Sequence, residues 1–147
     1  MGHWMRVRNR SMEPTLSHND IIFAKKWEGD DTLIRDDIVV LRLSDKFGGL
    51  SVKRVVALPG DHVNVESGTV RINGQPLGDK YLSGLPKTRG LERLDCNVPL
   101  SHIFVLGDYR NYQHTIDSRK YGPIALSKIA GIVILRLWPF KIWRNHR

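Results

Sequence analysis

The chain has 147 residues, which suits one domain with a single core, and its 41% hydrophobic and 26% charged residues describe an ordinary globular protein. The formal net charge of +8 favours a basic exterior in contact with water, although nucleic acid or an anionic membrane surface would also suit it. The single cysteine, Cys96, excludes an intrachain disulfide, and its polar neighbours favour a thiol without a catalytic role.

Strand signals dominate the first half of the chain. Short β-branched or aliphatic runs bounded by turn residues predict strands at 21–24, 37–43 and 51–58. Residues 63–66 and 69–72 alternate apolar and polar side chains around a Ser-Gly turn, which predicts a hairpin with one face in water.

The second half contains fewer strand signals. Residues 76–99 have the glycines, prolines and charges of a loop, and strands are predicted again at 102–106 and 132–135. Residues 125–129 could form one helical turn. We therefore expect a mostly β fold with a middle insertion.

No membrane-spanning segment is predicted. A helix that crosses a bilayer needs about 20 apolar residues, and the best candidate, 129–140, is shorter and contains Arg136 and Pro139. Residues 1–10 lack the apolar region of a secretion signal.

The first segment that could carry chemistry runs from Ser11 to Leu16. A serine is a weak nucleophile unless a neighbouring base removes its proton. Pro14 fixes one backbone torsion and restricts Glu13, so the loop is stiff enough to hold a nucleophile in line. The alternative is a turn with a surface serine and a buried Met12.

The second segment places a lysine inside an apolar strand. Lys53 shares a strand face with Val55 and Ala57, so it points toward the core if that face is buried. Lysine is almost never buried without a reason, and burial can lower its pKa from about 10.4 to about 7–8, where it can act as a base. The alternative is a sheet edge with the amine in solvent.

The third segment runs from Gly107 to Gly122 and is crowded with hydrogen-bonding side chains. Asp117 and Arg119 could form a charge-assisted pair, and Thr115 or Ser118 could orient a neighbouring amine. A polar loop with satisfied turns would explain the composition equally well.

Metal-binding patterns are weak. The aspartates at 30, 31, 36 and 37 lack the alternating spacing of a calcium loop, and the six histidines show no paired spacing. We predict no metal and no cofactor.

Together the three segments resemble the type I signal peptidase family, including its mitochondrial inner-membrane branch. They occur in the family's order, with Lys53 42 positions after Ser11, and weaker similarity extends from Asn9 to about Trp138. The resemblance implies one catalytic domain over residues 1–147, a signal-peptidase-like β-sheet core with a small insertion at approximately 62–102.

The resemblance also implies roles for individual residues. Ser11 would attack the scissile carbonyl and neutral Lys53 would take its proton, while the Ser11 backbone N–H would form part of an oxyanion hole. Asn9 stands where the bacterial family often has a serine, and its amide could donate to the same oxyanion. Supporting roles fall to Asp117, Ser118 and Arg119.

Two departures from the family pattern bear on the site. Arg10 replaces a small residue and could narrow or recharge the cleft. The third segment is two residues longer than usual before its aspartate, so Thr115 falls where a lysine-orienting serine is expected.

The resemblance implies an endopeptidase that cleaves N-terminal targeting peptides from exported or translocated preproteins after small residues. It would be membrane-associated, with its catalytic domain on the outer (trans) face, and would involve no nucleic acid. Aromatic and apolar residues among Arg and Lys could contact the membrane, or could equally pack into the core. These residues are Trp4, Met5, Leu137, Trp138, Phe140 and Trp143.

Other interpretations of the sequence lead to different predictions. The chain could be a soluble maturation protease for one dedicated precursor. A self-cleaving repressor-type domain would need a cleavable segment upstream of Ser11, for which ten residues leave no room. From a different class, it could be an inactive relative or a basic β-barrel that binds nucleic acid, whose affinity would depend steeply on salt.

Overall fold

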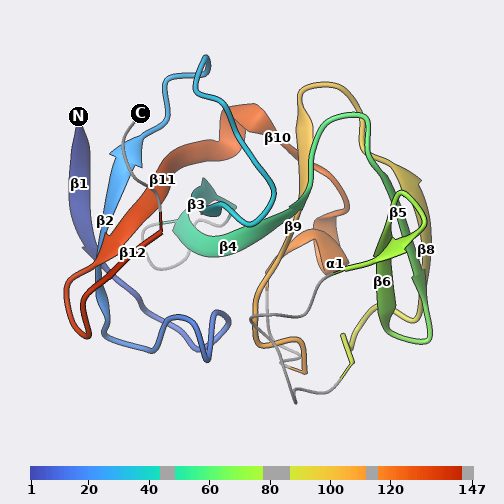
Figure 1. The fold of residues 1–147 in the computed structure, drawn as a ribbon, viewed down its shortest axis with the longest axis horizontal. Coiled ribbons are helices and arrows are strands. Elements are labelled where there is room, and N and C mark those ends of the chain that lie inside the picture. The colour runs from blue at the N-terminus through green and yellow to red at the C-terminus, as the bar shows by residue number, and fades with distance from the viewer. Residues whose placement is uncertain (44–48, 78–86, 112–115, 144–147) are drawn as a thin grey trace.

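The structure is a computed structural model that describes residues 1–43, 49–77, 87–111 and 116–143. Nearly all of its regular elements are strands, which form two antiparallel sheets (Figure 1). Within the described residues, the larger sheet has eight strands: β1 (Gly2–Arg6), β2 (Ile21–Lys26), β3 (Ile38–Arg42), β4 (Leu50–Ala57), β9 (His102–Leu106), β10 (Ile124–Ala125), β11 (Ile129–Arg136) and β12 (Lys141–Ile142). The expected mostly β class is confirmed.

The smaller sheet lies to the right in Figure 1 and is built from one stretch of chain. Its four strands among the described residues are β5 (His62–Glu66), β6 (Thr69–Ile72), β7 (Gln75–Pro76) and β8 (Arg93–Asn97). Two hydrogen bonds join the points where the chain leaves and returns, from Gly60 N–H to Val98 O at 2.9 Å and from Val98 N–H to Asp61 O at 2.8 Å. The division into one catalytic domain with an insertion at 62–102 stays a prediction.

Strand β4 lies inside the larger sheet, whose order is β1-β2-β11-β3-β4-β9-β10, with β12 paired to β11. It is buried from Ser51 to Ala57, because β3 pairs with one edge from Leu50 to Arg54, β9 pairs with the other edge from Arg54 to Ala57, and hydrophobic clusters cover both faces. A strand that is buried on both faces usually consists of apolar residues, so the buried cations Lys53 and Arg54 within it are unusual.

Three hydrophobic clusters hold the sheets together. One packs the loop after β1 against the larger sheet, through Met12, Leu16 and Val52. A second lies on the other face of that sheet, and a third, which includes Phe104 of β9 and Val63 of β5, joins the two sheets. Each fully buried side chain of this size contributes about 1.5–3 kcal/mol, so Met12 and Leu16 anchor the loop that carries Ser11.

The predicted strands and the 63–72 hairpin are confirmed, but the prediction of a loop over 76–99 is wrong. It contains β7 and β8, and β8 pairs along its whole length with β5. In β8 the apolar residues Leu94 and Cys96 lie opposite Val65 and Val63 of β5. They alternate with Asp95 and Asn97, whose low strand propensity made the segment resemble a loop. The predicted helical turn is confirmed as a 3-10 helix at Leu126–Lys128, and a second short helix, α1 (Ser118–Tyr121), was missed.

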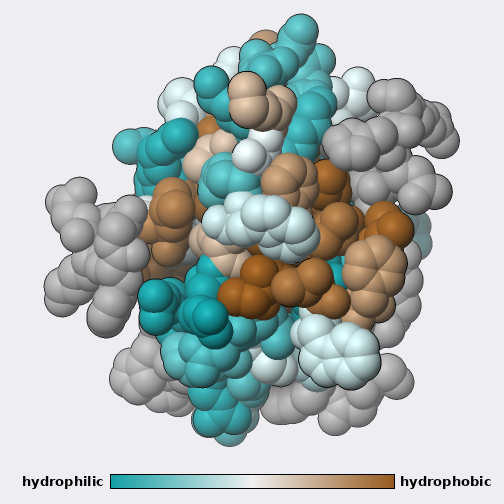
Figure 2. Space-filling view, turned by 90° about the vertical axis from the view of Figure 1, so that its left-hand side faces the viewer, coloured by the Kyte–Doolittle hydropathy of each residue, from teal (hydrophilic) through white to brown (hydrophobic). Residues whose placement is uncertain are grey.

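Hydrophobic side chains gather on the face that contains the ends of β1, β2 and β12 (Figure 2). The most exposed of them define what we call the apolar edge: Trp4, Leu137, Trp138, Phe140 and Ile142. Trp4 is 54% exposed and Trp138 79% exposed. In the part of the chain that the structure describes, no helix is long and apolar enough to cross a bilayer.

Candidate active site

The structure brings the expected nucleophile and base into direct contact. Lys53 Nζ lies 2.9 Å from Ser11 Oγ, and both residues are buried, with only 1% of Lys53 exposed. Nζ also donates to the carbonyl oxygen of Val52 at 2.9 Å. An amine and a hydroxyl at this distance can exchange a proton.

Burial changes the acidity of this amine. It lowers the pKa of Lys53 from 10.5 to about 8, because the charged form loses its hydration. The negative charge of Asp117 opposes this effect and the positive charge of Arg119 reinforces it. A useful fraction of Lys53 is therefore neutral near physiological pH.

The end of β9 makes room for Ser11 beside Lys53. The pairing of β4 with β9 ends at Arg54 opposite Leu106, so Lys53 is the first residue of β4 beyond it. The chain then turns at Gly107, where a Cβ atom would lie only 2.5 Å from the Ser11 carbonyl oxygen. Tyr109 N–H donates to that same oxygen at 2.9 Å. Only glycine at position 107 permits this approach, which holds the Ser11 loop against the third segment.

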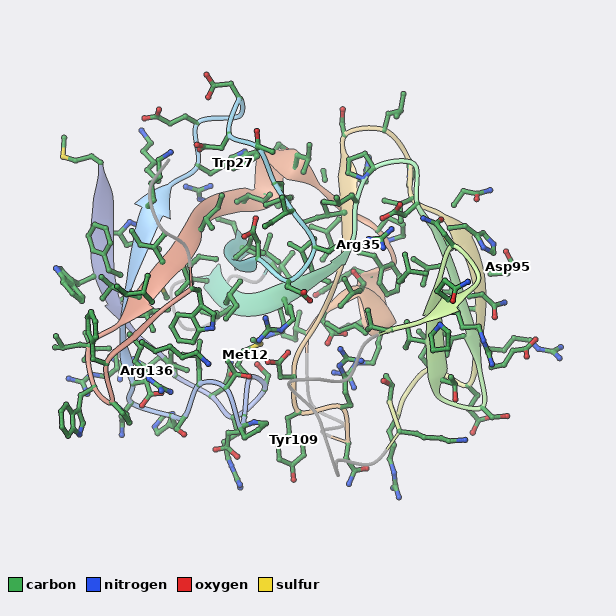
Figure 3. The ribbon with its side chains drawn as sticks, in the orientation of Figure 1. Met12, Trp27, Arg35, Asp95, Tyr109 and Arg136 are labelled. Carbon is green, nitrogen blue, oxygen red and sulfur yellow. The ribbon has the colours of Figure 1, made fainter. Side chains whose placement is uncertain are left out.

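Figure 3 shows the same meeting point from the side-chain view. Met12, next to Ser11 in the chain, and Tyr109 are both labelled near the lower centre, where the loop after β1 approaches the chain that follows β9.

Asn9 contacts Ser11 as a hydrogen-bond acceptor, whereas the sequence analysis expected a donor. Its Oδ1 accepts from the Ser11 N–H at 3.1 Å and from Ser11 Oγ–H at 2.8 Å. The amide therefore presents its oxygen to the nucleophile and not its N–H₂ group. The expected donor role of Asn9 requires a half-turn of the side-chain amide.

A buried ion pair that the sequence analysis missed joins the three segments. Arg54 donates to Asp108 through Nε at 2.9 Å and through Nη2 at 2.7 Å. Asp108 also accepts from Thr15 Oγ1, and Arg54 Nη1 donates to the Asp36 carbonyl at 2.9 Å. Arg54 and Asp108 are 2% and 0% exposed. The only sequence signal was a second cation inside an apolar strand.

The expected pair of Asp117 and Arg119 is present. Arg119 donates to Asp117 through Nη2 at 2.7 Å and through Nε at 3.0 Å. Burial alone would raise the pKa of Asp117, but the hydrogen bonds and charge of Arg119 and the Gly107 N–H outweigh it and hold this pKa below 3.8. Asp117 also caps α1, while Ser118 Oγ accepts from Val105 N–H at 2.9 Å.

The other expected supporting residue, Thr115, lies outside the described residues. Ser118 turns its hydroxyl toward β9, so the hydrogen bond described here gives it a structural contact and no contact with the Lys53 amine.

Arg10 folds onto the surface beside the site. Its guanidinium pairs with Glu13 at 3.1 Å and lies 6.0 Å from the centre of the Tyr109 ring. The carboxylate of Glu13 compensates the extra positive charge, so Arg10 recharges the cleft less than the sequence suggested.

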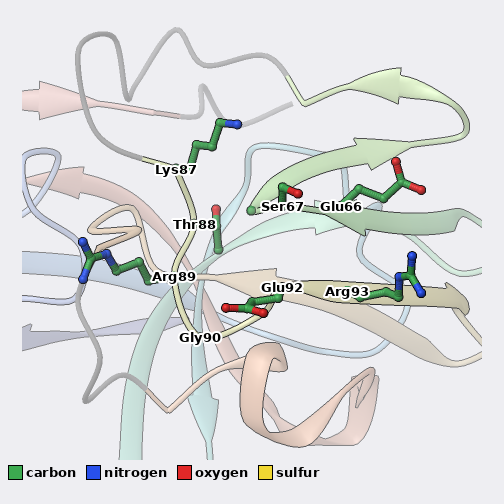
Figure 4. A pocket seen from close by; sticks show the side chains of 9 residues that line it. Glu66, Ser67, Lys87, Thr88, Arg89, Gly90, Glu92 and Arg93 are labelled. Atoms are coloured by element: carbon green, nitrogen blue, oxygen red, sulfur yellow. The ribbon is translucent and has the colours of Figure 1, made fainter.

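A hollow of about 1030 Å³ lies between the smaller sheet and residues 87–93, and it contains neither Ser11 nor Lys53 (Figure 4). It connects to the site through Thr88, whose Oγ1 accepts from Arg110 at 3.2 Å. Arg110 in turn donates to the Gly107 carbonyl at 2.9 Å. In the described ranges, no group of three or more His, Cys, Asp or Glu side chains could hold a metal ion.

The sequence of the chain matches the family model described as "Signal peptidase, peptidase S26" over residues 1–138. The chain belongs to the S26 family of signal peptidases. This confirms the resemblance inferred from the three segments, and with it the serine-type endopeptidase class.

Individual S26 proteins agree with this assignment. The chain is 34% identical to the probable signal peptidase I-2 of Synechocystis over 90% of its own length and 62% of that protein's length. It is 33% identical to the mouse mitochondrial inner membrane protease subunit 1, covering 88% of this chain and 66% of that one.

A solved structure of the S26 family has the same fold. Signal peptidase I from Enterococcus faecalis V583 superposes with a TM-score of 0.56 at 28% identity, covering 69% of this chain and 97% of that chain. The sheet architecture described above is thus that of a signal peptidase.

Proposed function

We propose that this chain is a Ser/Lys-dyad signal peptidase that removes N-terminal targeting peptides from preproteins after small residues. The observation that carries the proposal is the 2.9 Å contact between Ser11 Oγ and an amine whose pKa burial lowers to about 8. The preference for small residues is taken from the family.

In the proposed mechanism, Ser11 Oγ forms a bond to the scissile carbonyl carbon while Lys53 Nζ accepts its proton. The tetrahedral intermediate then breaks its C–N bond, and Lys53 returns that proton to the leaving amine. Lys53 next takes a proton from water, whose oxygen attacks the carbonyl carbon of the acyl-enzyme. The second tetrahedral intermediate then breaks its C–Oγ bond, and Lys53 returns the proton to Ser11 Oγ as the cleaved peptide leaves.

The oxyanion of each intermediate would be held by the Ser11 N–H. In the structure this donor is bonded to Asn9 Oδ1, so the substrate carbonyl must displace that contact. A half-turn of the Asn9 amide would then present Nδ2 as a second donor, and one such donor is worth about 2.7–4 kcal/mol to the transition state.

An extended substrate would fit the edge of β4 that precedes Lys53. Leu50, Ser51 and Val52 pair with β3 on one side, and β9 pairs with β4 only from Arg54 onward. A peptide that adds as a strand at this edge would bring its carbonyl to Ser11.

We further propose that the apolar edge contacts the membrane and, by analogy with the family, that the catalytic domain lies on its outer (trans) face. Exposed tryptophans and leucines near cationic side chains favour the boundary between lipid headgroups and acyl chains. Met5 and Trp143, which the sequence suggested for this surface, pack instead against the cluster beneath the nucleophile loop.

The test is cleavage of a fluorogenic peptide with an Ala-x-Ala site, in the presence of lipid, by wild type, Ser11→Ala and Lys53→Met. We expect cleavage by wild type and none by either variant, with folding checked by circular dichroism. Ser17→Ala and Lys128→Met are matched controls, because both side chains are exposed.

Equal activity in all variants would refute the roles of Ser11 and Lys53. Cleavage of one natural precursor but of no peptide would favour the alternative of a dedicated maturation protease.

A further inference from the structure

The hairpin of β11 and β12 has two faces with different contacts. Trp4, Phe23, Leu135 and Ile142 lie directly opposite one another across four strands and so share one face. Trp4 packs edge-on against Phe23 with ring centres 5.1 Å apart. Trp4 and Ile142 on this outer face belong to the apolar edge.

Arg136 is one position further along β11, so its side chain points to the opposite, inner face. Its Nε donates to the carbonyl oxygen of Pro139, in the turn of the hairpin, at 2.7 Å. Its Nη1 donates to the carbonyl oxygen of Thr15 at 2.9 Å, and the guanidinium lies 5.8 Å from the centre of the Trp143 ring. Arg136 thus joins the β11–β12 hairpin, which we call the aromatic hairpin, to the loop that carries Ser11.

Thr15 is fixed from two sides. Its hydroxyl donates to Asp108, which Arg54 holds in the core, and its carbonyl accepts from Arg136 at the periphery. In Figure 3 Arg136 is labelled on the left, beside the turn of the hairpin. Thr15 is four residues from Ser11, and a misplacement of about 1 Å at a reacting atom can cost about 10²-fold in rate.

From these contacts we infer that Arg136 is a positioning residue for Ser11, which makes the placement of the nucleophile depend on the aromatic hairpin. The inference rests on the proposed function, because it requires cleavage by Ser11 and docking of the apolar edge on lipid. Lipid that immobilises Trp138 and Phe140 stabilises the hairpin turn against which Arg136 is held, and kcat rises as a result.

The geometry of the contact requires an arginine. The two carbonyl oxygens are 2.7 and 2.9 Å from different nitrogens of one planar group, and Asp20 Oδ2 lies 3.5 Å from Nη1. A lysine would keep the charge toward Asp20 but could not bridge both carbonyls with the same geometry. Arg136→Lys is therefore expected to rescue only part of the function.

The experiment compares wild type, Arg136→Gln, Arg136→Lys and Arg71→Gln, with and without phosphatidylcholine vesicles that contain phosphatidylglycerol. Arg71→Gln removes the same charge from β6 on the smaller sheet, away from the nucleophile loop. Vesicle binding is measured by sedimentation, and kcat and KM by cleavage of the Ala-x-Ala peptide.

We expect kcat of Arg136→Gln to fall roughly ten- to a hundredfold with KM unchanged, and vesicles to raise kcat of wild type and Arg71→Gln but not of Arg136→Gln. Arg136→Lys should be intermediate, and all four proteins should bind vesicles equally.

Equal kcat for Arg136→Gln and wild type would overturn the positioning role. A lowered kcat that still responds fully to vesicles would overturn the dependence on the hairpin. A wild type that binds vesicles and does not cleave would instead refute the proposed function itself, and Arg136 would have nothing to position.

Discussion

Two neighbouring cations of β4, Lys53 and Arg54, are buried to nearly the same extent and have opposite surroundings. Arg54 makes two hydrogen bonds to the carboxylate of Asp108. The hydrogen bonds that the structure gives Lys53, within the described residues, go to two neutral oxygens, Ser11 Oγ and the Val52 carbonyl. Burial alone therefore does not make a base. Burial beside neutral acceptors lowers the pKa of an amine, whereas burial beside a carboxylate holds a charge in place.

The largest expected effect sharpens this contrast at Lys53. Lys53→Arg keeps a cation in the site, but a guanidinium cannot lose its proton. We expect kcat/KM for peptide cleavage to fall roughly 10⁴-fold or more, as for Lys53→Met. Lys128→Arg, at an exposed position, should retain full activity. Retention of substantial activity by Lys53→Arg would show that Lys53 is not the base.

The next largest effect is on the stability of the protein and tests the pairing of Arg54 with Asp108. Asp108→Asn removes the carboxylate from the buried guanidinium of Arg54 and should lower the free energy of unfolding by about 3–5 kcal/mol, measured by urea denaturation. Glu13→Gln breaks the exposed pair with Arg10 and should cost less than about 1 kcal/mol.

A similar loss in Asp108→Asn and Glu13→Gln would contradict the distinction between the buried and the exposed pair. Replacing both partners, as Arg54→Met with Asp108→Leu, should restore much of the stability while impairing cleavage.

Removing the Lys53 amine should have the opposite effect on the free energy of unfolding from removing the Asp108 carboxylate. Because its folded-state pKa is lowered from 10.5 to about 8, the cost of burying the charged amine is fully present below pH 8. Lys53→Met should therefore stabilise the fold by up to about 3 kcal/mol at neutral pH, at about 1.36 kcal/mol per pKa unit. The gain should shrink as pH rises from 8 toward 10.5, because wild type then loses the buried charge.

Urea denaturation of the Lys53→Met variant and wild type at several pH values measures this difference. A variant less stable than wild type at neutral pH would indicate that Lys53 is held there as a stabilising cation.

The smallest effect is on the pH dependence of cleavage. Only neutral Lys53 can accept the proton of Ser11, so kcat/KM should rise about tenfold per pH unit and level off above about pH 8. The profile is measured with the fluorogenic peptide. A plateau that begins near pH 6, about two units lower, would place the essential base elsewhere.

The parts of the site that the sequence could predict are those that lie in short, ordered segments. Ser11 and Lys53 could be named because each stands in an unusual local setting, a stiff proline loop and an apolar strand. The pair of Arg54 and Asp108 could not, because it joins residues 54 positions apart whose proximity depends on how β4 pairs with β9. The orientation of the Asn9 amide depends on contacts within the folded site, which residue type alone does not fix.

The same division holds for the fold. Strands with continuous apolar or β-branched runs, such as β3 and β4, were predicted nearly to their ends. Strand β8 was missed because pairing with β5 overrides the poor intrinsic preference of Asp95 and Asn97 for strands. The cap that begins α1 was readable in principle, since aspartate is a favoured first residue before a helix.

The chain enters and leaves the smaller sheet at one place, where Gly60 and Asp61 form backbone hydrogen bonds with Val98. Because both ends of the insertion meet at this point, its turns could change in length without moving the strands on either side. Two sets of contacts limit larger changes. Phe104 of β9 shares a buried hydrophobic cluster with Val63 of β5, and Thr88 and the Arg89 carbonyl accept hydrogen bonds from Arg110 and Arg119. A grafted insert would have to cover that apolar face of the larger sheet and reproduce those hydrogen bonds.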